Sequence, residues 1–188
     1  REDCADPHGP WAFLIADASG HGPAAAVVAA IVHAVLHAFP GVPPGPGALL
    51  AWLNRHLHAK QLELTFVTAF LAFYDPATRR LRYGRAGHNP PLLKRADGTV
   101  IRVDHRHGPV MGVSPESRYA EGVLTLSDGD TLMIYTDGIT EAMDAKHRFF
   151  SEGRLTRLLT DLDDQSPEPL VQAVLNAVHS FQVGVPPA

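Results

Sequence analysis

The order of the expected elements predicts an α+β fold in which two largely antiparallel sheets are flanked by helices. One strand and two helices come first, a run of strands joined by short turns follows, and two helices come last. Because no helices separate those strands, consecutive strands should pair antiparallel. With 45% hydrophobic residues, the 188-residue chain can bury a sizeable core as one domain over residues 1–188.

The first part of the chain should form a buried strand followed by a buried helix. Residues 11–16 are a short apolar run typical of a strand, which stops at the turn-like segment 17–22. Pro23 suits the first turn of a helix. Residues 24–39 are nearly all apolar and rich in alanine, which predicts a helix that is buried on most sides.

The rest of the chain changes from helix to alternating strands and turns. After a Pro/Gly linker over 40–47, apolar residues at helical spacing over 48–60 predict an amphipathic helix. The later strands are bounded by turn residues such as Asp75-Pro76 and Asp97-Gly98. We expect strands over 66–74, 81–86, 91–95, 99–103, 121–126 and 131–135, and helices over 152–162 and 167–181.

Composition argues against several classes of function. The formal net charge of −4 and the sequence pI near 6.2 give no overall positive field that would attract nucleic acid. The longest apolar stretch, 23–39, is interrupted by histidines and is too short to span a bilayer, so we expect no direct membrane insertion. Cys4 is the only cysteine, so no internal disulfide can form, and a reducing cytoplasm is expected.

Two segments carry the chemistry that the sequence predicts. Each is an apolar strand followed by an aspartate and small residues, with Asp17 in the first and Asp137 in the second. A carboxylate at the rim of a core is costly if it is unpaired, and Mg²⁺ or Mn²⁺ would relieve that cost through carboxylate and carbonyl oxygens. Taken alone, Asp137-Gly138 would be interpreted as a turn, and Asp17 as a cap of the following helix.

Six ordered motifs together resemble one known family. They are Asp17-Ala18-Ser19-Gly20-His21-Gly22, Phe66-Val67-Thr68-Ala69, Gly87-His88-Asn89-Pro90-Pro91, Gly108-Pro109-Val110-Met111-Gly112-Val113, Leu126-Ser127-Asp128-Gly129-Asp130 and Tyr135-Thr136-Asp137-Gly138-Ile139-Thr140-Glu141-Ala142. The first motif, followed by an alanine run, is similar to the GDVSGHG…AA signature of SpoIIE-like phosphatases. These belong to the PPM family of metal-dependent protein phosphatases, and the resemblance extends over essentially the whole chain.

The resemblance implies an α-β-β-α sandwich with two divalent cations, Mn²⁺ or Mg²⁺, at one end of the paired sheets. It implies that Asp17 bridges both cations, that the Ala18 carbonyl binds one and that Asp137 binds the other. A metal-activated water would then attack phosphoserine or phosphothreonine. The implied substrate is a phosphorylated anti-sigma-factor antagonist or a similar phosphoprotein. The residues expected to shape the site loop or contact phosphate are Ser19, Gly20, His21, Gly22 and Gly138.

The chain departs from the family pattern at both ends. An upstream Gly-Gly-Asp segment and a late Asp-Asp pair with its following strand are unmatched, so we expect a domain truncated at both ends that binds metal weakly. Unpaired sheet edges would let a second copy pair there as a homodimer. The alternative function is a non-catalytic sensor or docking module that kept the fold and lost metal competence. The other aspartates near the two ends have the wrong sequence context to replace the missing ones: Asp3, Asp6, Asp161, Asp163 and Asp164.

Two further groups of residues have both a functional and a simpler interpretation. Ser19 and His21 are close enough in sequence to suggest a nucleophile and a base, but no acidic partner is evident, which favours a turn. His105 and His107 have the spacing of a metal-binding pair, although an exposed loop is the favoured interpretation.

Overall fold

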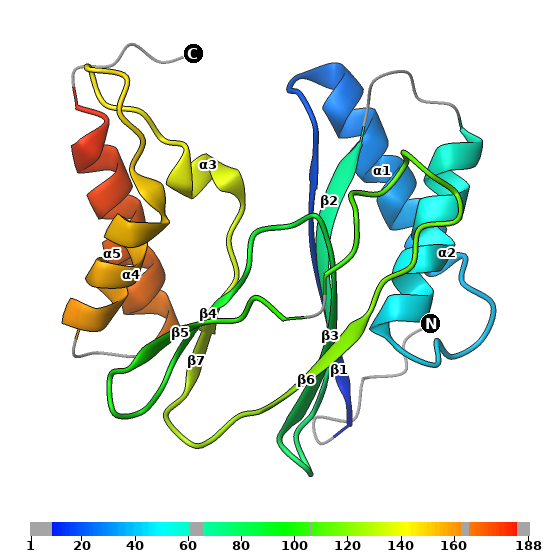
Figure 1. The fold of residues 1–188 in the computed structure, drawn as a ribbon, viewed down its shortest axis with the longest axis horizontal. Coiled ribbons are helices and arrows are strands. Elements are labelled where there is room, and N and C mark those ends of the chain that lie inside the picture. Colours follow the sequence, from blue (N-terminus) through cyan, green and yellow to red (C-terminus); the bar gives the residue numbers. More distant parts are fainter. Residues whose placement is uncertain (1–8, 61–65, 106, 163–165, 184–188) are drawn as a thin grey trace. The chain divides into compact units, whose positions relative to one another are not determined.

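The structure, a computed structural model, describes residues 9–60, 66–105, 107–162 and 166–183. The chain divides into two compact units: the first contains residues up to His88 together with Asp104–Leu126, and the second contains Asn89–Val103 and residues from Ser127 onward. Each unit has one antiparallel sheet with helices packed against it (Figure 1). The prediction of two antiparallel sheets flanked by helices is therefore confirmed.

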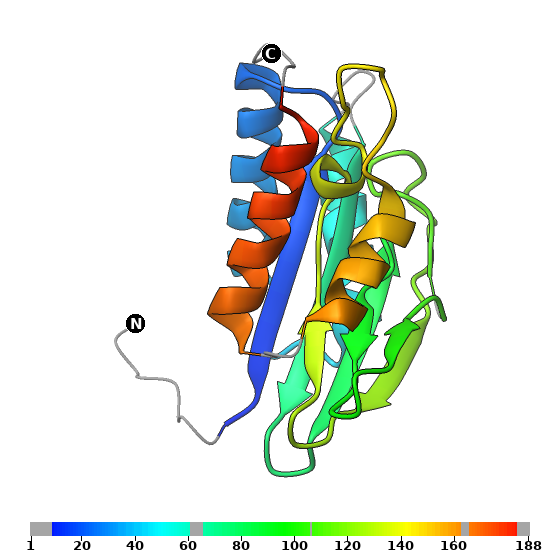
Figure 2. The same cartoon turned by 90° about the vertical axis from the view of Figure 1, so that its left-hand side faces the viewer.

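The first unit contains a four-stranded sheet in the order β1-β2-β3-β6. The strand β1 pairs with β2 along its whole length, from Trp11 opposite Tyr74 to Ala18 opposite Val67. Figure 2 shows β1 in blue running beside β2. The four strands are β1 (Trp11–Ala18), β2 (Val67–Asp75), β3 (Arg80–Ala86) and β6 (Glu121–Thr125).

The helices α1 (Pro23–His37) and α2 (Pro46–Ala59) pack on one face of this sheet (Figure 1). Each begins with a proline in its first turn, where the missing N–H has no intrahelical acceptor to lose. The leucine face of α2 is fully buried, as Leu50 and Leu53 illustrate. Leu71 of β2 belongs to the same core, so this face of the sheet is closed by α2.

The prediction that the first helix is buried on most sides is wrong. Only Val28 and Val32 are buried among the 15 residues of α1, and Val27 is 56% exposed. Alanine has the highest helix propensity and a small side chain, so an alanine-rich helix can form with only one narrow face covered. The structure therefore leaves most of this alanine-rich helix surface exposed on the first unit.

The second unit contains a three-stranded sheet in the order β5-β4-β7, with three residues in each strand. Two helices pack against it through an apolar core that includes Leu92, Leu155 and Leu170. Over the described ranges, none of the helices of either unit combines the length and the apolar character needed to cross a membrane. The elements are β4 (Leu92–Lys94), β5 (Val100–Arg102), β7 (Thr131–Met133), α4 (Ser151–Asp161) and α5 (Pro167–Phe181).

Two boundaries next to the predicted metal ligands differ from expectation. The first strand does not stop at residue 16, because Asp17 and Ala18 still pair with β2. The last strand ends at Met133 rather than at residue 135, and a short helix α3 (Asp137–Thr140) replaces the expected turn. Asp17 is therefore a strand residue, whereas Asp137 begins a helix.

Candidate functional site

Asp17 lies where β1 ends and the loop to α1 begins. It is half-buried and directly opposite Thr68 of β2. Two residues further on, the Ser19 backbone N–H donates to the Phe66 carbonyl at 2.9 Å, and Ser19 Oγ accepts from the Phe66 N–H at 3.0 Å. The strand pairing and these two bonds fix the backbone on both sides of Asp17 against β2.

The loop after Ser19 owes its shape to two glycines. Gly20 and Gly22 have φ angles of 88° and 79°, a region that residues with a Cβ rarely adopt. No heavy atom lies within 4 Å of the place where a Cβ would stand on either glycine, and His21 between them is exposed. The loop backbone is therefore accessible to a ligand. Gly22 is the N-cap of α1, so the interpretation of Asp17 as the cap is wrong.

A buried histidine lies beside the strand partner of Asp17. Thr68 Oγ1 and His88 Nδ1 are 2.9 Å apart, and His88 is 2% exposed. His88 reaches this position because Gly87 turns the chain after β3 with a φ of 64°. A Cβ on Gly87 would come within 2.4 Å of Val110 Cγ1, so glycine is required here by both conformation and space.

The loop around Met111 is held against the start of β2. Met111 and Val67 exchange two backbone hydrogen bonds, at 2.8 and 3.0 Å. Asn54 of α2, which is fully buried, accepts from the Gly112 N–H at 2.9 Å and donates to the Ser114 carbonyl at 2.7 Å. A buried amide is tolerated when both of its ends are bonded, so Asn54 clamps this loop to α2.

A second polar contact holds the backbone of His88. The Arg85 guanidinium donates to the His88 carbonyl at 2.8 Å and to Asp104 Oδ1 at 2.6 Å. Arg85 is only 6% exposed, whereas the Asp104 side chain is 47% exposed, so solvent weakens this ion pair.

Taken together, these contacts bring parts of four sequence motifs into one place in the first unit. The residues are 17–22, 66–69, 87–88 and 108–113.

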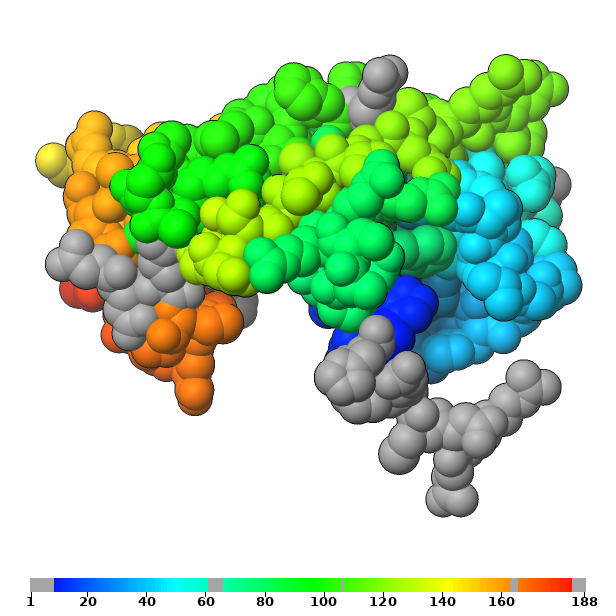
Figure 3. Space-filling view, turned by 90° about the horizontal axis from the view of Figure 1, so that it is seen from below, coloured from blue at the N-terminus to red at the C-terminus, as the bar shows by residue number. Residues whose placement is uncertain are grey.

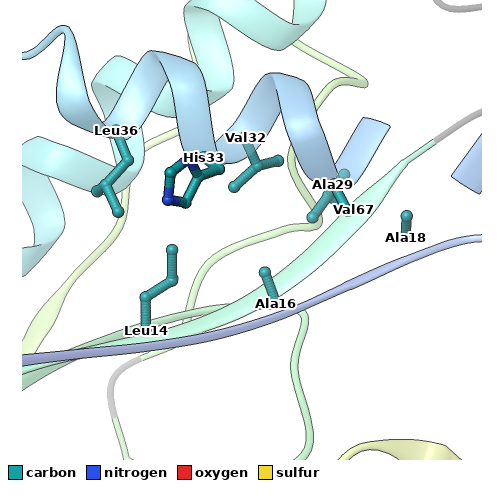
Figure 4. Close-up of a pocket in the computed structure, with 8 residues that line it drawn as sticks. All are labelled: Leu14, Ala16, Ala18, Ala29, Val32, His33, Leu36 and Val67. Atoms are coloured by element: carbon teal, nitrogen blue, oxygen red, sulfur yellow. The ribbon is translucent and has the colours of Figure 1, made fainter. Parts of the chain in front are cut away.

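Two hollows of the first unit are not lined by Asp17, Thr68 or His88. One, of about 200 Å³, lies between α1 and β1 and is lined mainly by apolar side chains, including Ala16 and Ala18 (Figure 4). Because successive residues of a strand point to opposite faces, Asp17 points away from this hollow. The other, of about 390 Å³, lies at the far end of the sheet, by the β2–β3 turn that Figure 3 shows from below. There the Thr78 hydroxyl lowers the pKa of Asp75, as in an ordinary polar turn.

Asp137 belongs to the second unit and is exposed at the start of α3. Its carbonyl accepts from the Glu141 N–H at 2.7 Å and from Thr140 Oγ1 at 3.3 Å, so these bonds hold the backbone and leave the carboxylate out of the turn. Gly138 follows it and is also exposed. The two predicted carboxylate ligands therefore come from different units.

The donors at these positions fit a hard cation in kind. Asp17 and Asp137 offer carboxylate oxygens, Ala18 offers a carbonyl, and the loop next to Asp17 is open to solvent. Mg²⁺ and Mn²⁺ prefer such oxygens and keep waters in their remaining positions. In the described part of the chain, no three His, Cys, Asp or Glu side chains gather into a metal-binding group, so water or other donors would have to complete the coordination.

The remaining candidates from the sequence do not join this cluster. His105 and His107 are exposed in the loop before Gly108, as expected, and Asp161 is exposed at the end of α4. Sequence reasoning did not identify Thr68, His88 and Asn54 as site residues, although the first two lie in quoted motifs. Asp3, Cys4, Asp6, Asp163 and Asp164 lie outside the described residues.

Comparison with known proteins identifies the family of the chain. The family model described as Stage II sporulation protein E (SpoIIE) matches residues 7–186. The chain is 25% identical over 171 residues to phosphoserine phosphatase RsbU of Bacillus subtilis, a match that covers 90% of this chain and 50% of RsbU. The chain thus spans half or less of the length of the curated relatives it matches.

Several solved structures have the same fold as this chain. The SiaA-PP2C domain of Pseudomonas aeruginosa has a TM-score of 0.80 at 21% identity, with 97% of this chain and 73% of that chain covered. RsbX, solved in complex with magnesium, has a TM-score of 0.67 at 16% identity, with 96% and 77% covered. The chain therefore has the fold of PP2C-type phosphatase domains and belongs to the SpoIIE family.

Proposed function

We propose that this domain is a metal-dependent protein serine/threonine phosphatase that uses two divalent cations, Mn²⁺ or Mg²⁺. The observation that carries the proposal is the convergence of four family motifs around Asp17, through the β1–β2 register and the contacts of Ser19, Thr68 and Met111. RsbU is named a phosphoserine phosphatase, and RsbX was solved with magnesium, which supports both the reaction and the type of metal.

The residues of the chain would each contribute one part of the reaction. The carboxylates of Asp17 and Asp137 and the carbonyl of Ala18 would hold the cations. When bound, the cations supply an activated water and neutralise charge on the phosphoryl oxygens. The open loop of Ser19, Gly20, His21 and Gly22, together with Gly138, would receive the phosphoryl group. Ser19 acts here as a loop-shaping residue, because its Oγ already accepts from the Phe66 N–H.

The proposed substrate is a phosphorylated regulatory protein of the anti-sigma-factor antagonist type, or a similar phosphoprotein, in the cytoplasm. RsbU and RsbP, both named phosphoserine phosphatases, support the substrate class.

We also propose that the chain forms a homodimer through an open sheet edge, since β1 has β2 as its one strand partner among the described strands.

Dephosphorylation of a serine-phosphorylated antagonist protein, followed by phosphate release, tests the proposed reaction. We expect activity with Mn²⁺ or Mg²⁺, none with excess chelator, and a loss of roughly 100-fold or more in Asp17→Asn and Asp137→Asn. The matched control is Asp97→Asn, which changes an exposed turn aspartate bonded to the Thr99 N–H and should keep full activity. Full activity in chelator would contradict the proposal.

The second candidate function is a non-catalytic sensor or docking module with the same fold. The observation that favours it is that the described residues contain no group of three metal-binding side chains. The same assay separates the two functions: such a module would release no phosphate with either metal, yet would still bind the phosphorylated protein.

A further inference from the structure

A polar pair lies next to Asp17 on the same face of the four-stranded sheet. Thr68 is the direct partner of Asp17 in the antiparallel β1–β2 register. Directly opposite residues share a face, with Cβ atoms about 4.5–5.5 Å apart. On its other side, Thr68 Oγ1 lies 2.9 Å from His88 Nδ1. The order Asp17, Thr68, His88 thus runs from the open end of β1 into the buried part of the unit.

The fold holds this pair from several directions. Gly87 turns the chain so that His88 lies beside Thr68, and its N–H donates to the Gly108 carbonyl at 2.9 Å. Arg85 donates to the His88 carbonyl at 2.8 Å, which fixes the backbone while Thr68 fixes the ring. A valine at position 68 would suit a strand surrounded by apolar residues, and a buried imidazole needs a partner to offset its desolvation. These contacts indicate a role for the pair beyond packing.

We propose that Thr68 and His88 are positioning residues that fix the orientation of the Asp17 carboxylate. The inference rests on the proposed role of Asp17 as a metal ligand. With the proton on Nδ1, His88 donates to Thr68 Oγ1, which leaves the hydroxyl proton of Thr68 for an acceptor other than His88, and Asp17 is the residue directly opposite Thr68. A carboxylate that is hydrogen-bonded by a neighbour in this way binds metal more tightly, because less freedom is lost when the cation arrives.

The Mn²⁺ dissociation constant of the chain, measured by calorimetry, tests the role of the hydroxyl. Thr68→Val removes the hydroxyl at nearly constant shape and should weaken Mn²⁺ binding about 10–100-fold. Thr68→Ser restores the hydroxyl and should stay within a few-fold of the wild type. The matched control is Tyr83→Phe, which removes another buried hydroxyl of this sheet, bonded to the His105 carbonyl at 3.2 Å. It should leave Mn²⁺ binding unchanged.

Kinetics of the phosphatase reaction separate positioning from a merely structural role. In Thr68→Val, the Mn²⁺ concentration for half-maximal activity should rise as the dissociation constant does, while kcat at saturating Mn²⁺ stays within a few-fold. If Thr68→Val binds Mn²⁺ as the wild type does while Asp17→Asn loses binding, the positioning role is wrong and the proposed function stands. If the wild type binds no Mn²⁺, or Asp17→Asn binds it equally well, the proposed metal site fails and this inference fails with it.

Discussion

The two units hold their predicted site residues in different ways. In the first unit, Asp17 lies in an eight-residue strand whose surroundings are fixed by polar contacts of Thr68, His88 and Asn54. In the second unit, Asp137 is the exposed first residue of a four-residue helix, and the nearby β7 has three residues. Each unit also has an apolar core of its own. Hydrogen bonds fix the positions of the groups that they join, whereas burial of apolar side chains stabilises a fold without fixing their directions. Substitutions of the polar residues near Asp17 and of apolar core residues should therefore have different consequences.

Removal of a core side chain from the second unit should have the largest effect on stability. Leu155 of α4 is fully buried in the core with Phe150 and Leu170. Leu155→Ala should lower the free energy of unfolding by about 2–5 kcal/mol, measured by urea denaturation. Val171→Ala on α5, where the side chain is 47% exposed, is the control and should cost less than about 0.5 kcal/mol. Equal costs for the two variants would show that the apolar core does not stabilise this unit.

Loss of the Asn54 hydrogen bonds should lower the free energy of unfolding less than Leu155→Ala does. It should loosen mainly the loop that Asn54 holds. Asn54→Ala removes both bonds to the loop, leaves the Gly112 N–H and the Ser114 carbonyl without this partner, and should cost about 1–3 kcal/mol. Amide exchange at residues 111–114 should quicken more than elsewhere in the unit. Asn176→Ala, which removes an exposed bond to Gln172, is the control. Unchanged exchange in the Asn54 variant would mean that the loop does not depend on this clamp.

The pH dependence of the Asp144 turn should give the smallest effect. The backbone N–H and the guanidinium of Arg148 lower the pKa of Asp144 from its ordinary value of 3.8 to about 2. Because the folded pKa is the lower one, the stabilisation is complete above about pH 4 and is lost as the pH falls toward 2. Urea denaturation of the wild type and Asp144→Asn should therefore differ at pH 6 and converge near pH 2. A difference that stays constant with pH would exclude this ion pair as its source.

Local sequence patterns were sufficient to predict most of the strands and helices. Turn residues and apolar runs predicted the strands, and leucine spacing predicted α2, because these patterns reflect contacts within one element. The same patterns predicted the helix α1 but not its exposure, because alanine can be either buried or exposed. They also missed α3, whose four residues are too few to show a period. The prediction that Asp17 follows a strand was wrong by two residues, because pairing with β2 decides where β1 ends.

The contacts around Asp17 could not be predicted from local patterns. Thr68 and His88 are 20 positions apart, and Asn54 and Ser114 are 60 apart, so neither pair leaves a periodic signal in the sequence. The ordered motifs indicated which segments matter but not which side chains touch. Thr68 lies inside an apolar strand, where a threonine is ordinarily a surface or packing residue. Strand register was the missing information, since it places Thr68 opposite Asp17.

The proposed reaction and the proposed role of Thr68 both require that a divalent cation binds at the end of β1. The most direct measurement is a titration of the ¹⁵N-labelled chain with Mn²⁺, in which the paramagnetic ion broadens amide signals close to its binding site. We expect that signals of residues 17–20 and 66–68 broaden first and that this broadening is lost in Asp17→Asn. Broadening confined to other places, such as the exposed histidine pair His33 and His37 of α1, or broadening that persists unchanged in Asp17→Asn, would contradict the claim.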